Sequence, residues 1–220
     1  MDSENPLLQL IQPLPEFEIT RRSTALLVID MQYFDAHKDF GVFAKALELG
    51  LESVFKYYFD RLEVIVPNIA RLQVAFREAG VEVVYTKIES LTLDGRERSL
   101  GHKNKNIFTP RNSRDAAILE ELEPLDNEIV LSKTASGVFN STAIDHILRN
   151  LGIDTLVVTG VVTNNCVENA VRAACDLSYK VILVEDGCAA VKEDLHQAAV
   201  RAMNDHFAKV KSTKDVLAML

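Results

Sequence analysis

Short apolar runs of strand length alternate with stretches of helical spacing along most of this chain, and this alternation constrains the fold more than any other feature. The run "TALLVID" is continuously apolar up to its terminal aspartate, which is typical of a strand buried on both faces. The predicted strands are 24–30, 81–87, 128–133, 154–160, 180–186 and 208–213. Because strands joined through helices need crossover connections, the pattern predicts a parallel sheet with helices on both sides.

Helical segments separate these strands. Pro67 is expected in the first turn of one helix, and Gly80 lies just beyond the end of that helix. The other expected helices are 42–59, 113–122, 141–152, 164–177 and 193–207. Residues 88–112 are polar, rich in arginine, lysine and asparagine, and show no period. A connection of this length is typically functional or flexible.

Composition limits the class of protein. With 220 residues, 48% of them hydrophobic, the chain is predicted to form a single domain over 1–220, with residues 1–22 wrapped over its surface. The formal net charge of -8 argues against a nucleic-acid partner, since phosphate binding needs a basic face. No apolar run is long enough for a membrane span, and the N-terminus lacks signal-peptide features. Three cysteines without paired spacing are typical of a reducing compartment, so we expect a cytoplasmic protein.

Three reactive side chains stand at or just after the ends of predicted strands. Asp30 closes the first strand, Lys133 closes the third, and Cys166 follows the fourth by a short turn. Each has an ordinary explanation, as a turn residue, a solvated cation or a small buried thiol. In a parallel sheet, however, ligands bind beyond the carboxyl ends of the strands, where all three would meet. Their coincidence favours a functional interpretation.

Together these side chains can perform nucleophilic catalysis. A helix N-terminus and a neighbouring ammonium both favour a thiolate, and Cys166 falls in the first turn of the helix expected over 164–177. Backbone N–H groups in that turn can stabilise the oxyanion that forms when a thiolate attacks an amide carbonyl. Asp30 can accept the thiol proton and later deliver it to a leaving amine, while Lys133 keeps Asp30 oriented and ionised. The scheme needs no histidine.

Three sequence blocks surround these residues: "ALLVIDMQ", "LSKTASGVFNST" and "VVTGVVTNNCVENAVRAACDLSYKVILVEDGCAA". In this order, over about residues 22–211, they resemble the signature blocks of the isochorismatase-like cysteine hydrolases. The resemblance implies a three-layer α/β/α fold with a six-stranded parallel, Rossmann-like sheet, and a catalytic triad of Asp30, Lys133 and Cys166. It also implies a cis peptide between Val161 and Val162, and an oxyanion hole made by the backbone N–H groups of Val162 and Cys166.

Departures from the family's patterns limit which reactions this chain is expected to catalyse. Nicotinamidases of this superfamily carry an Asp-x-His metal motif and a further histidine after the second strand, where this chain has only His102, expected to be a polar surface residue. We therefore expect no catalytic metal and no cofactor. Isochorismatases proper, which cleave a vinyl ether, generally lack the cysteine. Cys166 thus points to cleavage of a C–N bond through an acyl-enzyme intermediate, with release of ammonia or an amine.

The block "SGVFNST" is similar to that of the ureidoacrylate hydrolases, which favours a small linear amide or a ureido or carbamoyl compound as substrate. Gln32 is a candidate hydrogen-bond partner for such a substrate, and Phe34 and Phe139 are candidates for an apolar wall. For both rings, core packing is at least as good an explanation. The basic residues between 94 and 105 either meet a substrate carboxylate or form a solvated run. These are Arg96, Arg98, His102, Lys103 and Lys105.

Other features receive structural interpretations. Cys175 and Cys188 are expected to be buried thiols, with the role of Cys188 at the active edge left open, and Asp186 and Gly187 are expected to shape a turn. The resemblance implies a homo-oligomer, a dimer or tetramer, for which the segment 42–59 is a candidate interface. A vinyl-ether hydrolase, a nicotinamidase-like amidase and a catalytically silent small-molecule-binding protein remain alternatives. A nucleotide-binding protein is disfavoured, because the turn after the first strand has no glycine fingerprint.

Overall fold

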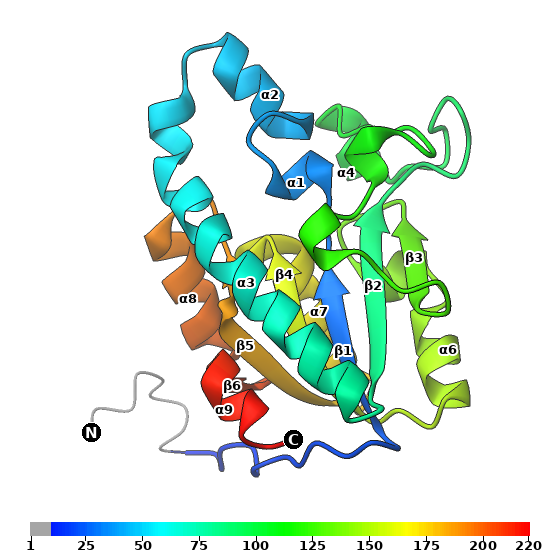
Figure 1. Ribbon diagram of the computed structural model, residues 1–220, viewed down its shortest axis with the longest axis vertical. Helices are drawn as coiled ribbons and strands as arrows, with labels where there is room; N and C mark the ends of the chain where they lie inside the picture. Colours follow the sequence, from blue (N-terminus) through cyan, green and yellow to red (C-terminus); the bar gives the residue numbers. More distant parts are fainter. Residues whose placement is uncertain (1–9) are drawn as a thin grey trace.

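A six-stranded sheet with only parallel pairings runs through the molecule in the order β3-β2-β1-β4-β5-β6 (Figure 1). The computed structural model describes residues 10–220. Its strands are β1 (Thr24–Ile29), β2 (Glu82–Ile88), β3 (Ile129–Lys133), β4 (Thr155–Val161), β5 (Lys180–Ala189) and β6 (Lys209–Lys211). Every predicted strand is present, and the predicted parallel sheet is confirmed.

The direction of strand order reverses at β1. From β1 the chain moves outward through β2 to β3, and it then returns to the other side of β1 as β4. Such a reversal creates a crevice at the carboxyl ends of the two central strands, where α/β proteins bind ligands. Gly160 of β4 pairs with Ile29 of β1 at this end, and a Cβ on Gly160 would lie 2.0 Å from the Ile29 carbonyl oxygen. Glycine is therefore required for the strands to approach here.

Helices cover both faces of the sheet, as the predicted three-layer α/β/α fold requires (Figure 1). The α-helices are α1 (Tyr33–Ala36), α2 (Gly41–Glu48), α3 (Lys56–Glu78), α4 (Leu100–Asn104), α5 (Val138–Ser141), α6 (Ile144–Asn150), α7 (Glu168–Asp176), α8 (Glu193–Met203) and α9 (Thr213–Leu217). Leu26 and Val28 of β1 pack into one apolar core with α3, whereas Leu27 and Ile29 pack into a second core with α6 and α7. Burial on both faces explains the continuous apolar run of β1.

The longest helix, α3, contains Pro67 in its interior. The prediction that Pro67 lies in the first turn of a helix is therefore wrong, and so is the prediction of one helix over 42–59. Instead α2 ends at Glu48, and a 3₁₀ turn, η2 (Glu52–Phe55), leads directly into α3. A proline inside a helix removes one backbone hydrogen bond. The helix remains continuous because its buried stripe packs along the sheet; the stripe consists of Tyr58, Leu62, Ile65, Ile69, Leu72, Gln73 and Phe76.

Two further helix predictions are only partly correct. The helix expected over 113–122 is instead two 3₁₀ turns, η3 (Arg114–Ala116) and η4 (Glu120–Leu122), although Ser113 caps the first of them as expected. The helix expected over 141–152 begins only at Ile144, as α6, because Thr142 has an extended backbone; Ser141 belongs to the separate short helix α5. Periodicity places these segments correctly but does not detect the breaks, which depend on single residues.

The described part of the N-terminal segment, residues 10–22, runs over the surface. Most of its residues are exposed, and Lys211 of β6 pairs with Glu16 at 2.7 Å. The rest of the predicted surface segment, residues 1–9, lies outside the described residues. Within residues 10–220, every helix is too short or too polar to cross a membrane.

Candidate active site

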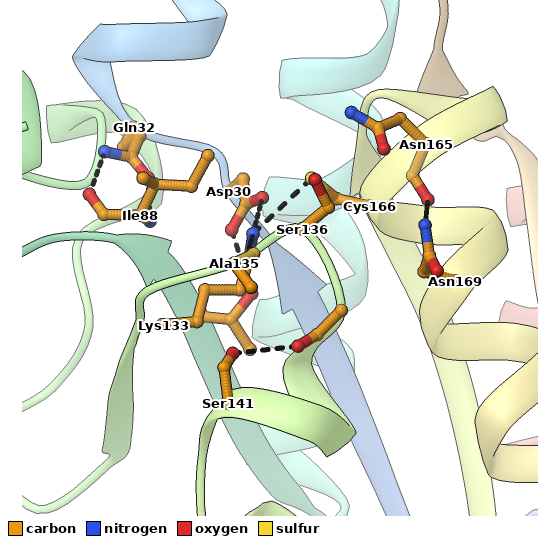
Figure 2. Close-up of polar contacts among 12 residues, drawn as sticks. Asp30, Gln32, Ile88, Lys133, Ala135, Ser136, Ser141, Asn165, Cys166 and Asn169 are labelled. Atoms are coloured by element: carbon orange, nitrogen blue, oxygen red, sulfur yellow. Dashed lines mark hydrogen bonds and ion pairs between the residues drawn. The ribbon is translucent and has the colours of Figure 1, made fainter. Parts of the chain in front are cut away.

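Asp30, Lys133 and Cys166 come from three different strand ends and meet at the switch point of the sheet (Figure 2). Asp30 follows β1 with φ of +53°, a left-handed conformation that aspartate adopts more readily than most residues. Lys133 is the last residue of β3. Cys166 lies in a π-helical turn, η5 (Thr163–Val167), which joins β4 to α7. Asp30 and Lys133 are fully buried, and Cys166 is 5% exposed.

The ammonium of Lys133 is the centre of the cluster. Its Nζ atom lies 2.8 Å from Oδ2 of Asp30, 3.0 Å from the carbonyl oxygen of Ala135, and 3.4 Å from Sγ of Cys166. One acceptor therefore stands near each of its three N–H groups. Figure 2 shows the carboxylate, the ammonium and the thiol pointing toward one another.

Strand β2 holds the carboxylate of Asp30 in place. The Thr86 hydroxyl donates a hydrogen bond to Oδ1 of Asp30 at 3.1 Å, and the Asp30 backbone N–H donates to the Thr86 carbonyl at 2.9 Å. One carboxylate oxygen thus faces Thr86 and the other faces Lys133. This orientation leaves Asp30 placed to exchange a proton next to the sulfur.

The protonation states of the cluster follow from its burial. Burial raises the pKa of the Cys166 thiol well above its usual range; the Lys133 ammonium opposes this shift, and Asp30 adds to it. Burial by itself would lower the pKa of Lys133, but attraction to Asp30 and Cys166 outweighs this, and the net shift is upward. The resting pair is therefore a neutral thiol beside a charged ammonium. The Lys133 ammonium favours the thiolate, as expected, but desolvation outweighs this effect in the resting site.

Val161 and Val162, between which the family resemblance implies a cis peptide, lie just before the turn that carries Cys166. The peptide bond between Val161 and Val162 is cis. Val162 precedes η5, in which Asn164 departs from helical geometry. Cys166 consequently sits in an irregular turn ahead of α7 rather than in the first turn of one regular helix over 164–177.

Gln32 is buried and bridges two neighbouring segments. Its side-chain amide donates to the carbonyl oxygens of Ile88 at 3.0 Å and Asp115 at 2.9 Å, and its Oε1 accepts from the Ile88 N–H at 2.5 Å. Figure 2 shows Gln32 directed toward Ile88. Because both of its N–H donors are in use, contact with a substrate would require one of these bonds to be exchanged. That contact stays a prediction.

The two candidate wall residues have different surroundings. Phe34, in α1, is buried but belongs to neither apolar core of the described residues. Phe139, in α5, packs against the core beneath α6 and α7, with its ring 5.8 Å from that of Tyr179. Core packing is therefore the role that the structure gives Phe139, whereas Phe34 is still available as a wall. Substrate contact by either ring stays a prediction.

His102 is buried, not at the surface, so that prediction is wrong. It is 3% exposed in α4, and its Nε2 lies 3.4 Å from the hydroxyl of Ser136 in the loop after β3. The loop 88–112 packs against the loop that follows β3. The backbone N–H of Ser99 donates a hydrogen bond to the carbonyl oxygen of Thr134 at 3.0 Å. Burial, followed by repulsion from Lys133, lowers the pKa of His102 to about 4. The imidazole is therefore neutral at physiological pH.

The loop 88–112 also carries polar atoms without partners. Oγ of Ser90, Oγ1 of Thr109 and Nδ1 of His102 are buried and have no hydrogen-bond partner among the residues that the structure describes. Of the loop's cations, Arg98 lies over the Phe108 ring and donates to the carbonyl of Ile107 at 2.6 Å, so it holds the loop itself. The others remain at the surface; they are Arg96, Lys103, Lys105 and Arg111.

Asp35 is a second acid of the site that the sequence analysis does not identify. It follows Asp30 by five residues in "DMQYFD", and its Oδ2 is shielded from solvent without a partner in the described chain. Only its proximity to the expected catalytic aspartate could have drawn attention to it.

The two remaining cysteines are placed as structural residues. Cys188 is fully buried at the end of β5, beside Gly160 of β4, and burial raises its pKa to about 12. Cys175 is partly buried in α7. Asp186 and Gly187 lie within β5, so the turn predicted there is wrong. Oδ1 of Asp186 instead accepts hydrogen bonds from the N–H and hydroxyl of Thr213, which joins β5 to α9.

Metal ligands are not gathered anywhere in residues 10–220, where no group of three or more His, Cys, Asp or Glu side chains could hold an ion. The donor set at the switch point is one carboxylate, one ammonium and one thiol. An ammonium that contacts both of the other groups occupies the position where a cation would bind them. This arrangement suits proton transfer and nucleophilic attack.

Comparison with known proteins identifies a matching family and several relatives of this chain. A family model described as the isochorismatase domain matches residues 24–215. The ureidoacrylate amidohydrolase RutB of Acinetobacter baylyi is 27% identical, over 94% of this chain and 87% of its own length. An uncharacterized isochorismatase family protein of Bacillus subtilis, YddQ, is 30% identical, over 89% of this chain and 99% of its own length.

Solved structures have the same fold. A cysteine hydrolase from Pseudomonas syringae pv. phaseolicola is similar with a TM-score of 0.80 and 26% identity, over 94% of this chain and 97% of that one. An N-carbamoylsarcosine amidase from Thermoplasma acidophilum is similar with a TM-score of 0.66 and 26% identity, over 87% of this chain and 96% of that one.

Proposed function

The chain belongs to the isochorismatase family, and from this premise we propose that it is a cysteine amidohydrolase that cleaves a C–N bond of a small linear amide or ureide. The observation that carries the proposal is the buried contact of the Lys133 ammonium with both the Asp30 carboxylate, at 2.8 Å, and the Cys166 sulfur, at 3.4 Å. Relatives named as ureidoacrylate amidohydrolases and a neighbour named as an N-carbamoylsarcosine amidase support the class of substrate.

The proposed reaction begins from the neutral thiol. Asp30 takes the Sγ proton of Cys166 as the sulfur attacks the substrate carbonyl carbon, which creates an oxyanion. Lys133 remains charged throughout and compensates the negative charge that moves between sulfur, carboxylate and substrate. The backbone N–H groups of Val162 and Cys166 are the proposed donors to the oxyanion. Asp30 then returns the proton to the leaving nitrogen, the C–N bond breaks, and a thioester remains on Cys166.

Water completes the reaction. Asp30 accepts a proton from a water molecule, and the hydroxide attacks the thioester carbon. The C–S bond breaks, the acid product leaves, and the thiolate recovers its proton from Asp30. The products are the acid and ammonia or an amine, and the resting thiol is restored. Phe34 is the proposed wall beside the acyl group.

A screen for ammonia release tests this proposal. The panel contains nicotinamide, ureidoacrylate, biuret, triuret, N-carbamoyl amino acids and maleamate. We expect turnover of at least one linear amide or ureide, unchanged by a chelator, since the proposed steps use only protein groups. No release from any compound would contradict the amidohydrolase assignment and would favour a silent binding protein. Loss of activity with the chelator would contradict the metal-independent mechanism.

We also propose that the protein works as a homo-oligomer in the cytoplasm. Segment 41–55 exposes several large apolar side chains, which a second copy could cover. They are Val42, Leu47, Leu49, Leu51 and Val54. Light scattering after size exclusion is expected to give a dimer or tetramer at micromolar concentration, and replacing Leu49 and Val54 together by lysine is expected to shift it toward monomer. A monomeric parent protein would contradict the proposal.

A further inference from the structure

Asp35 has a fixed backbone and an unused side chain. The hydroxyl of Tyr58, in α3, donates to the Asp35 carbonyl oxygen at 2.7 Å, which holds α1 against α3. The side-chain oxygen Oδ2, in contrast, is inaccessible to solvent and has no hydrogen-bond partner within residues 10–220. A shielded carboxyl oxygen without a partner is energetically unfavourable. The Oδ2 atom therefore has unused capacity to accept a hydrogen bond.

Asp35 lies in α1, which follows the carboxyl end of β1 at the edge of the sheet that carries the three reacting groups (Figure 1). Its charge raises the pKa of Lys133, at the end of β3, and the pKa of Cys166 in η5, and the charge of Asp30 raises the pKa of Asp35. Burial, followed by the charge of Asp35, raises the pKa of Tyr58 on α3. Asp30, Lys133, Cys166 and Tyr58 are thus the titratable groups coupled to Asp35, each from a different segment. A substrate bound at Cys166 would lie at the same edge of the sheet as Asp35.

Charge determines what can bind there. The Lys133 ammonium already has Asp30, Cys166 and the carbonyl of Ala135 as acceptors, so it is not available to neutralise Asp35. Arg98 of loop 88–112 is occupied within its own loop, and the other cations of that loop are exposed. A substrate carboxylate placed beside Asp35 would therefore meet a second negative group. An N–H donor would instead satisfy the free oxygen.

We propose that Asp35 is a specificity-determining residue whose Oδ2 accepts hydrogen bonds from an NH or NH₂ group of the substrate, which selects neutral, N–H-rich ureides over substrates that carry a carboxylate near the scissile amide. This inference rests on the proposed amidohydrolase function and specifies its substrate class. It distinguishes this chain from a ureidoacrylate hydrolase, whose substrate carries a carboxylate.

The ionisation of Asp35 is expected to make ligand binding depend on pH. Burial, then repulsion from Asp30, raises the pKa of Asp35 to about 7, while Lys133 opposes the shift. Below this pH the carboxyl is protonated and is a weaker acceptor. Binding of an N–H donor is therefore expected to strengthen as pH rises through about 7, and the protonation of Asp35 is expected to weaken it below that value.

The test measures binding instead of turnover. Calorimetric titration of biuret and of N-carbamoylglycine into the full-length Cys166→Ala protein gives the two dissociation constants between pH 5.5 and 8.5. We expect biuret to bind more tightly, with an affinity that rises through pH 7. Adding Asp35→Asn is expected to weaken biuret about 10- to 100-fold, the loss of one charged hydrogen bond, and to remove the pH dependence. It is expected to leave N-carbamoylglycine unchanged or bound more tightly.

The matched control is Asp39→Asn in the same background, because Asp39 is an exposed acid four residues away. It is expected to change neither dissociation constant. Equal weakening of both ligands by Asp35→Asn, an unchanged preference, or no binding of biuret would overturn the inference. The two failures are distinguishable: if the parent protein hydrolyses no compound but Asp35→Asn still reverses the binding preference, the amidohydrolase function fails while Asp35 remains the residue that sets which ligand binds.

Discussion

Replacement of Cys166 by serine is expected to lower kcat for any substrate of this protein by about 10³-fold or more while the fold persists. The thiol is the group that forms the covalent bond in the proposed reaction, and a serine hydroxyl in the same place holds its proton far more tightly. The change removes no buried volume of consequence, since cysteine and serine differ little in size. Initial rates of ammonia release and a thermal unfolding curve measure the two effects.

Cys175→Ser is the matched control for this experiment. Cys175 lies in α7, the helix that follows η5, and it is only partly buried. Its replacement is expected to leave kcat within about twofold, as for a residue away from the reacting atoms. Mass spectrometry of the acid-quenched parent protein is further expected to detect an acyl adduct that is absent in Cys166→Ser. Activity of Cys166→Ser close to that of the parent would remove Cys166 as nucleophile.

Replacement of Lys133 by methionine is expected to have the largest effect on stability. The change leaves the fully buried Asp30 carboxylate without its cation, and breaking a buried ion pair in this way costs about 3–5 kcal/mol in free energy of unfolding. Activity is expected to disappear as well, because nothing then compensates the charge beside Cys166. Urea denaturation followed by circular dichroism measures the first effect, and ammonia release the second.

The double variant Asp30→Asn, Lys133→Met separates stability from catalysis. With both charges removed, most of the lost stability is expected to return, whereas activity is expected to remain absent. Lys180→Met is the surface control, since its pair with Asp154 is about half exposed, and it is expected to change stability by less than about 1 kcal/mol. If Lys133→Met unfolds at the same urea concentration as the parent, the ion pair does not contribute as described.

The pH dependence of this contribution has a definite sign. The pKa of Lys133 is raised in the folded protein, so the stabilisation is fully present below the pKa of an unfolded lysine. It is lost only as pH rises through the higher folded value, in strongly alkaline solution. Titration of Lys133 is therefore expected to cause no change, between pH 5 and 9, in the difference in stability between the parent protein and Lys133→Met.

Local patterns were sufficient to predict the sheet and the meeting of Asp30, Lys133 and Cys166. The short, continuous apolar run of β1 is typical of a strand enclosed on both faces, and parallel strands bring their carboxyl ends to one edge. Patterns were insufficient for α3, where Pro67 suggested a helix start. A stripe of buried side chains from Tyr58 to Phe76 outweighs the missing hydrogen bond, and the strength of that packing is not visible in a window of sequence.

The sequence and the tertiary structure determined different properties of the polar residues of this protein. The sequence by itself determined the order of strands and helices and which strand ends carry an acid, a lysine and a cysteine, because hydrophobic periodicity is a local property of the chain. The tertiary structure decided that His102 is buried, that the amide of Gln32 is occupied, that Oδ2 of Asp35 has no partner within residues 10–220, and that burial raises the pKa of the Cys166 thiol. Each of these depends on desolvation and on partners from distant segments, and both arise only when the loops close over the edge of the sheet.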